Sequence, residues 1–121
     1  MRFLICISSC ILFSLQALSQ AKVKLADLKE HIGDSVVVEG AVKAIQYSEN
    51  TKQSSTFITV GNLNNSLIVV ITRTVRKKFT VKPEVAYKDK SIRVSGWLVN
   101  RNNKPQIVIK DPSQIVLIDD K

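Results

Sequence analysis

The sequence has little that supports catalysis by sulfur or imidazole groups. Among its 121 residues are two cysteines, Cys6 and Cys10, and one histidine, His31. Both cysteines lie in the N-terminal apolar stretch, so the rest of the chain contains no disulfide and no cysteine-based zinc site. His31 has no histidine or cysteine beside it, which makes it a poor metal ligand and a poor general base.

The N-terminal residues have the pattern of a secretory signal peptide. Arg2 precedes an apolar stretch over residues 3–15, and small residues follow at Ala17, Ser19 and Ala21. The stretch is too short for a membrane span. We therefore expect an exported protein, periplasmic or secreted, that is cleaved after Ser19 or Ala21.

We therefore predict a signal peptide over residues 1–21 and one domain over residues 22–121, with no membrane span in the mature chain. About a hundred residues are enough for one small hydrophobic core. A lipid anchor on Cys10 is the alternative, but a lipidated cysteine follows the apolar stretch, whereas here the stretch continues through Phe13.

Charge is distributed unevenly. Residues 22–70 contain five lysines and five acidic residues, whereas residues 71–110 contain eleven lysines and arginines against two acidic residues. A polyanion should therefore meet the second half of the domain first. The alternative is that this charge only keeps the protein in solution.

Hydrophobic periodicity predicts a small β-rich domain. The expected elements are a helix over 24–32, strands over 35–47, 56–60, 67–72, 91–99 and 106–110, and a short helix around Val75 and Phe79. Alternation over 35–47 places Ala44 inside, and Lys43 and Tyr47 together outside. The predicted core is Val36, Val38, Val42, Ile58, Val60, Val69, Ile71, Ile92, Val94, Leu98, Ile107 and Ile109.

Three strands, a helix and two strands are the order of the oligonucleotide/oligosaccharide-binding (OB) fold, an all-β, five-stranded Greek-key barrel with a plug helix between strands three and four. Over residues 23–118 the sequence also resembles a bacterial family of OB-fold domains described as tRNA-anticodon-domain-like. The resemblance rests on VVVEGAV, TFITVGN, RKKF, KSIRVSGWL and KPQIVIKDPSQI. It implies nucleic-acid binding, and a final segment that turns at Asp111 and Pro112 and returns to the barrel at Ile115.

An enzymatic role finds no support among the motifs. The sequence has no nucleophile elbow, no phosphate-cradling glycine loop and no zinc spacing. Thermonuclease-like phosphodiesterases, an OB-fold enzyme class, hold calcium between clustered carboxylates. Here the carboxylates stand apart, at Glu39, Glu49, Glu84, Asp89 and Asp111. We expect a binding module that is not an enzyme, with no metal and no cofactor.

Binding of single-stranded nucleic acid needs aromatic rings for the bases beside cations for the phosphates. Outward strand positions and the loop between the last two predicted strands supply both. The candidate residues are Lys43, Tyr47, Phe57, Arg93, Trp97, Arg101 and Lys104. Two alternatives apply: Trp97 and Phe57 instead cover a peripheral part of the core, and Arg76, Lys77 and Lys78 form only the solvated side of the plug helix.

The third strand predicts a rival function. Leu67, Val69 and Ile71 fill the barrel, which leaves Ile68 and Val70 pointing outward where an OB fold usually meets its ligand. An apolar outer face needs a cover, which the first helix, a second copy in a homodimer or a partner protein would provide. A protein-interaction module of the cell envelope is therefore the second hypothesis, and binding of a small ligand or saccharide is the third.

Overall fold

The computed structural model describes residues 21–47, 55–62 and 64–118. The elements are β1 (Ala21–Lys22), η1 (Leu25–His31), β2 (Ser35–Tyr47), β3 (Thr56–Gly61), β4 (Ser66–Ile71), α2 (Arg73–Arg76), α3 (Pro83–Ala86), β5 (Ser91–Arg101), β6 (Lys104–Ile109), η2 (Pro112–Gln114) and β7 (Ile115–Ile118). The predicted signal peptide lies almost wholly outside the described residues.

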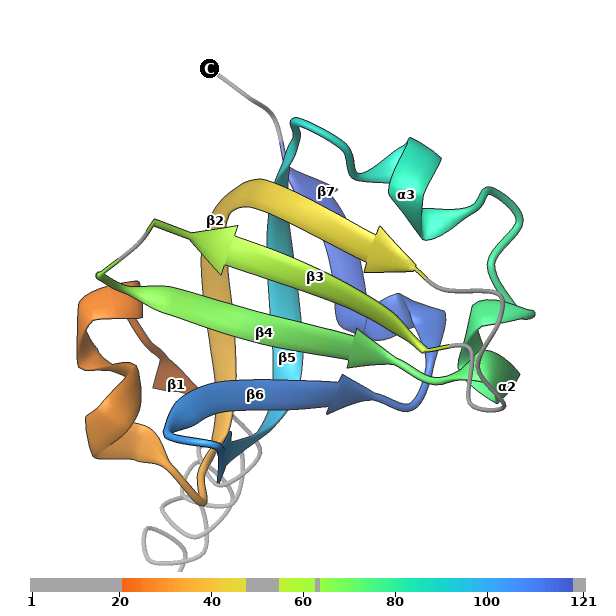
Figure 1. The fold of residues 1–121 in the computed structure, drawn as a ribbon. Coiled ribbons are helices and arrows are strands. Elements are labelled where there is room, and N and C mark those ends of the chain that lie inside the picture. The colour runs from red at the N-terminus through yellow and green to blue at the C-terminus, as the bar shows by residue number, and fades with distance from the viewer. Residues whose placement is uncertain (1–20, 48–54, 63, 119–121) are drawn as a thin grey trace, which may run out of the picture.

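Five strands form a closed barrel in the order β2, β3, β4, β6, β5, and β5 pairs back with β2. The β4–β6 pair is parallel, while the other barrel pairs are antiparallel. In Figure 1, β3, β4 and β6 lie in front of β5 and β7. The predicted all-β barrel of the OB fold is confirmed.

The core follows from residue alternation along the strands. All twelve predicted core residues are buried, and Leu67 joins them on β4. Burying one large aliphatic side chain contributes about 1.5–3 kcal/mol, so this single cluster supplies the main driving force for folding.

The two ends of the barrel are closed by different segments: η1 lies at one end and α2 at the other (Figure 1). The helix predicted over 24–32 is a 3-10 helix over Leu25–His31. At Gly40 of β2, a Cβ would stand 2.8 Å from Val60 Cγ1 and 3.1 Å from Leu25 Cδ1. Gly40 therefore lets η1 dock closely on the barrel.

The predicted alternation of β2 is wrong beyond Val42. Val42 pairs with Val60 and Ala44 with Thr59, so Lys43 is an extra residue in a β-bulge. A bulge of one residue exchanges the two faces of the strand that follows it. Ala44 is therefore exposed rather than inside, and Tyr47, opposite the buried Thr56, lies on the inner side and not beside Lys43.

Between β4 and β5 the chain forms two short helices where one was predicted. Val75 of α2 is buried, as its spacing predicted. Phe79 lies beyond the end of α2 and packs edge to face on Tyr87, with ring centroids 6.2 Å apart. Pro83 then begins α3, because proline is well suited to the first turn of a helix.

The last segment returns to the barrel as predicted, through a turn at Asp111 and Pro112 that forms a capping box. The Asp111 side chain accepts from Ser113 N, and Gln114 Oε1 accepts from Asp111 N at 3.0 Å. Gln114 Nε2 donates to Ser95 O at 2.9 Å, and β7 then pairs with β5. KDPSQI thus holds β7 against β5.

Candidate polyanion-binding surfaces

The predicted binding residues lie on three separate surfaces of the barrel. Phe57 of β3 and the pair Arg101 and Lys104 of the β5–β6 hairpin border the sheet that contains β3, β4 and β6. Lys43 lies apart from them at the bulge of β2, in a hollow that it shares with Glu84 and Lys88. Arg93 and Trp97 lie on β5 where it pairs with the first half of β2. Tyr47 lies at the α2 end of the barrel. The sequence pattern did not show this division, because it depends on how the strands wrap around the core.

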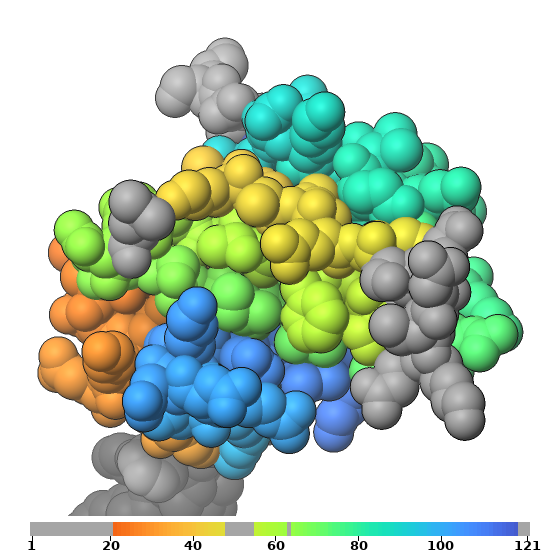
Figure 2. All heavy atoms as spheres, viewed as in Figure 1, coloured from red at the N-terminus to blue at the C-terminus, as the bar shows by residue number. Residues whose placement is uncertain are grey.

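The first surface, here called the front face, is formed by the outward side chains of β3, β4 and β6. Phe57 is 41% exposed and lies opposite Val70, which lies opposite Val108 of β6. Ile68 and Val70 point outward as predicted, and both are half-buried. Figure 2 shows β3 and β4 (green) between β2 (yellow) and the blue atoms of β5 and β6. The front face is therefore an apolar strip with one exposed ring.

The β5–β6 hairpin supplies cations at the edge of the front face. Asn102 and Asn103 have φ angles of 56° and 63°, as a two-residue hairpin turn requires. Arg101 and Lys104 are cross-strand partners flanking this turn, and both are exposed. Neither forms an ion pair with an acidic residue in the described part of the chain.

The second surface, here called the back face, carries Arg93 and Trp97 on one side of β5, as predicted. Arg93 Nε donates to Glu39 Oε2 at 2.7 Å, and Lys22 Nζ lies 3.3 Å from Glu39 Oε1. The hydrogen bond from Arg93, followed by that from Lys22, lowers the pKa of Glu39. Part of the charge on this face is therefore already neutralised within the protein.

Trp97 and Phe57 do not cover the core, contrary to the alternative considered from the sequence. Trp97 is 61% exposed, and Phe57 on the front face is also exposed. The two rings lie on the outer sides of opposite walls of the barrel, since β5 lies behind β3 (Figure 1). A short ligand therefore cannot contact both rings at the same time.

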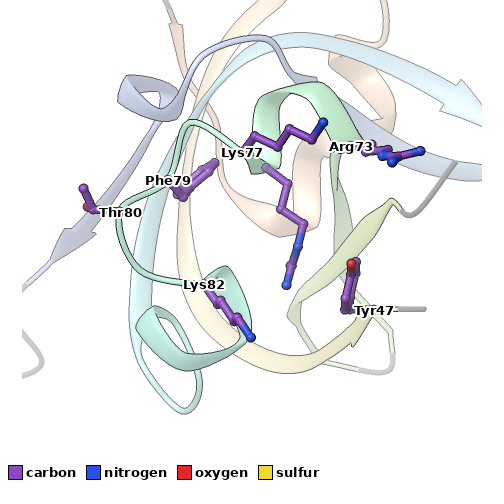
Figure 3. Close-up of a pocket in the computed structure, with 7 residues that line it drawn as sticks. Tyr47, Arg73, Lys77, Phe79, Thr80 and Lys82 are labelled. Atoms are coloured by element: carbon purple, nitrogen blue, oxygen red, sulfur yellow. The ribbon is translucent and has the colours of Figure 1, made fainter. Parts of the chain in front are cut away.

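The third surface is a hollow at the α2 end, here called the barrel-end pocket (Figure 3). It has a volume of about 580 Å³. The residues that line it are Tyr47, Arg73, Arg76, Lys77, Phe79, Thr80 and Lys82. Apart from Tyr47, they come from α2 and the segment that follows it. Four of the seven lining residues are therefore cations.

One alternative considered from the sequence placed Arg76 on the solvated side of the plug helix. This is wrong for Arg76, because its side chain is only 12% exposed. Arg76 Nη1 donates to Thr56 Oγ1 at 2.8 Å and to Glu84 Oε1 at 2.7 Å, while Nη2 donates to Glu84 Oε2 at 2.7 Å. Its guanidinium also lies 3.5 Å from the centroid of the Tyr47 ring. These contacts hold the guanidinium in one orientation.

The ion pair shifts the pKa of both partners. The hydrogen bond to Glu84 raises the pKa of Arg76, and the same bond lowers the pKa of Glu84. Sequence reasoning missed this pair because Arg76 belongs to α2 and Glu84 to α3, so no helical spacing connects them. Lys77 and Lys78 are exposed, in agreement with the solvated side predicted for this segment.

Outside these three surfaces, the features to consider are the single histidine, clusters of metal-ligating side chains and helices that could span a membrane. His31 Nδ1 lies 3.3 Å from Asp34 Oδ2 at the molecular surface. Within residues 21–47, 55–62 and 64–118, no three His, Cys, Asp or Glu side chains are placed to hold a metal ion. In the same ranges, no helix is long and apolar enough to span a membrane.

Comparisons with known proteins identify the fold. No protein-family model matches the sequence, and no curated protein is significantly similar to it. The structure is similar to the crystal structure of yeast Stn1 and Ten1, with a TM-score of 0.61 and 7% identity over 85% of this chain and 65% of that one. It is also similar to an OB domain from Thermoplasma acidophilum, with a TM-score of 0.55 and 15% identity over 84% of this chain and 91% of that one.

A third similar structure is a putative aspartyl-tRNA synthetase from Leishmania major Friedlin, with a TM-score of 0.55 and 10% identity. The match covers 86% of this chain but 22% of the synthetase. At such low identities, these similarities show the OB fold alone. The narrower resemblance to bacterial tRNA-anticodon-domain-like proteins stays a prediction.

Proposed function

We propose that the protein is an exported, non-catalytic OB-fold module that binds single-stranded nucleic acid, or another polyanion, weakly and with little sequence preference. The observation that carries this proposal is the front face. There an exposed phenylalanine lies beside β4, and the β5–β6 hairpin supplies two cations without acidic partners among the described residues.

The chemistry of the front face matches a single strand. A base stacked on Phe57 contributes about 1–3 kcal/mol, and stacking does not read the edge of the base, which explains a low sequence preference. Lys43, exposed at the bulge of β2, and the hairpin cations Arg101 and Lys104 are available to the phosphates. Such contacts release counterions and favour binding at low salt.

The structural neighbours support this proposal through the fold only. One of them is a synthetase named for tRNA, and the OB fold is widely used to bind oligonucleotides. Export rests on the pattern of residues 1–21. Ala21 and Lys22 pair with Val36 and Val37 of β2, which favours cleavage after Ser19, because cleavage after Ala21 would remove half of this pairing.

The proposal is tested by fluorescence anisotropy with a labelled oligothymidylate at low salt. Phe57→Ala should weaken binding by about 1–3 kcal/mol, since it removes a stacking platform. The double variant Arg101→Ala and Lys104→Ala should also weaken binding. The double variant Lys88→Ala and Lys90→Ala, an equal loss of charge before β5, is the matched control and should change little.

A second candidate function is a protein-interaction or self-association module. It is favoured by the apolar part of the front face, where Ile68, Val70 and Val108 are only half-buried. Val70→Glu should then abolish self-association or partner capture in a sizing experiment. If that variant disrupts an assembly and no oligonucleotide binding is detected at low salt, the nucleic-acid proposal fails.

A further inference from the structure

The barrel-end pocket has a composition that neither of these functions explains. Its volume of about 580 Å³ lies within the range of small-molecule sites, and two aromatic rings, Tyr47 and Phe79, form part of its wall. In Figure 3 the labelled side chains of Lys77, Lys82 and Tyr47 surround the hollow. It therefore combines apolar surface with a high local density of positive charge.

Among the described residues, acidic groups balance only part of the positive charge in the pocket. Glu84 is bonded to Arg76, and its pKa is lowered further by the charge of Lys82. Arg73 and Lys77 form no ion pair with an acidic residue among the described residues. Counted over the described residues, four cations against one carboxylate leave an excess of positive charge, and a bound anion would relieve the repulsion between the cations.

One of these cations, Arg76, is held in a fixed orientation by the protein. The bonds from Arg76 to Thr56 and Glu84 use three of its N–H groups. A guanidinium has five N–H groups, so two take no part in these three bonds. Because the orientation of Arg76 is already set, little side-chain entropy is lost when a ligand binds.

From this geometry we propose that the barrel-end pocket binds a phosphate monoester. A phosphate monoester carries a charge of about −1.5 to −2 at neutral pH and brings three acceptor oxygens to one point. A phosphodiester within a strand brings a single charge, which matches the converging cations less well. The organic part of the ligand would lie against Tyr47 and Phe79. The monoester is either a free nucleotide or the terminal phosphate of a strand.

The test titrates the whole protein with adenosine 5′-monophosphate, with adenosine as the control that lacks the phosphate, while NMR amide shifts are recorded. Shifts should appear for residues 73–82 with the nucleotide and not with adenosine. The double variant Arg73→Ala and Lys77→Ala should weaken binding by about tenfold, because each exposed charge pair contributes up to about 1 kcal/mol. Both side chains are exposed, so the fold should be retained.

A matched control and a pH series complete the test. The double variant Lys24→Ala and Lys29→Ala removes the same charge at the η1 end and should leave binding unchanged. Binding should weaken as the pH falls through about 6, where the phosphate takes up a proton. Equal losses in both double variants, or no binding of the nucleotide at millimolar concentration, would overturn the proposal.

Two oligothymidylates, with and without a 5′-phosphate, identify the source of the monoester. Stronger binding of the phosphorylated strand, lost in Arg73→Ala with Lys77→Ala, assigns the pocket to strand ends. Equal binding of the two strands, together with nucleotide binding, assigns it to free nucleotides. Failure of the front-face variants to affect the oligonucleotide would overturn the proposed function and leave the nucleotide result unaltered, since that result is obtained without a strand.

Discussion

Replacing Glu84 with glutamine tests whether the ion pair between α2 and α3 holds the end of the barrel together. The change keeps the size of the side chain and removes its charge. Arg76, whose side chain is 12% exposed, contacts both carboxylate oxygens at 2.7 Å; in the variant it keeps one neutral acceptor, the amide oxygen, and faces the amide NH2 donor in place of the other. Because hydrogen bonds to charged groups are stronger than neutral ones, and Glu84 is partly exposed to water, we expect a loss of about 1–3 kcal/mol.

The assay is urea or thermal unfolding followed by far-ultraviolet circular dichroism. A fluorescence assay would be insensitive, because Trp97 is largely exposed in the folded protein. For a domain of this size, each kcal/mol lowers the Tm by about 4–8 °C. Glu39→Gln is the matched control, since its partner Arg93 is 48% exposed, and it should have a smaller effect.

The difference between wild type and Glu84→Gln should depend on pH. The pKa of Glu84 is lowered from its ordinary value of 4.5, so the stabilisation is fully present above that pH. It is lost as the pH falls through the lowered pKa of the folded state, where Glu84 takes up a proton. Equal stability of the two proteins at neutral pH, or a difference that persists in strong acid, would refute this role of the pair.

Three other predictions concern the core, the packing of β5 and export. Ile107→Ala should reduce the free energy of unfolding by about 2–5 kcal/mol, whereas Val116→Ala, at an exposed site, should change it by less than about 0.5 kcal/mol. Gly96→Ala should destabilise the protein, because φ is +154° and a Cβ would stand 2.7 Å from Ile107 Cγ2; unfolding equal to wild type would contradict the packing of β5. Mass spectrometry of the exported protein should find an N-terminus between Gln20 and Val23, whereas an intact Met1 or a lipid on Cys10 would contradict the localisation.

The barrel was predictable from the sequence because its core is built by alternation. Ile92, Val94 and Leu98 are separated by two and four positions along β5, so all three lie on the same side of the strand, and each is buried. A one-residue change in spacing is not visible in such a pattern. The bulge at Lys43 has no glycine to mark it, so the inward turn of Tyr47 could be found only from the pairing of β2 with β3.

The binding surfaces were less predictable, because they depend on contacts between distant segments. Arg93 and Trp97 share a face as predicted, yet the barrel closure places them on the opposite wall from Phe57. The barrel-end pocket joins Tyr47 to the segment around α2. In the sequence, its cations resemble any other cluster on a basic surface.

The salt dependence of oligonucleotide binding tests the proposed function most directly. If the strand contacts Lys43, Arg101 and Lys104, log affinity should fall against log salt with a slope of about −2, since each phosphate contact on a single strand contributes about −0.7. Removing Arg101 and Lys104 together should reduce the slope to about −0.7. Phe57→Ala should weaken binding without changing the slope, because stacking carries no charge. Undetectable binding at low salt, or a slope that these variants leave unchanged, would contradict nucleic-acid binding on the front face.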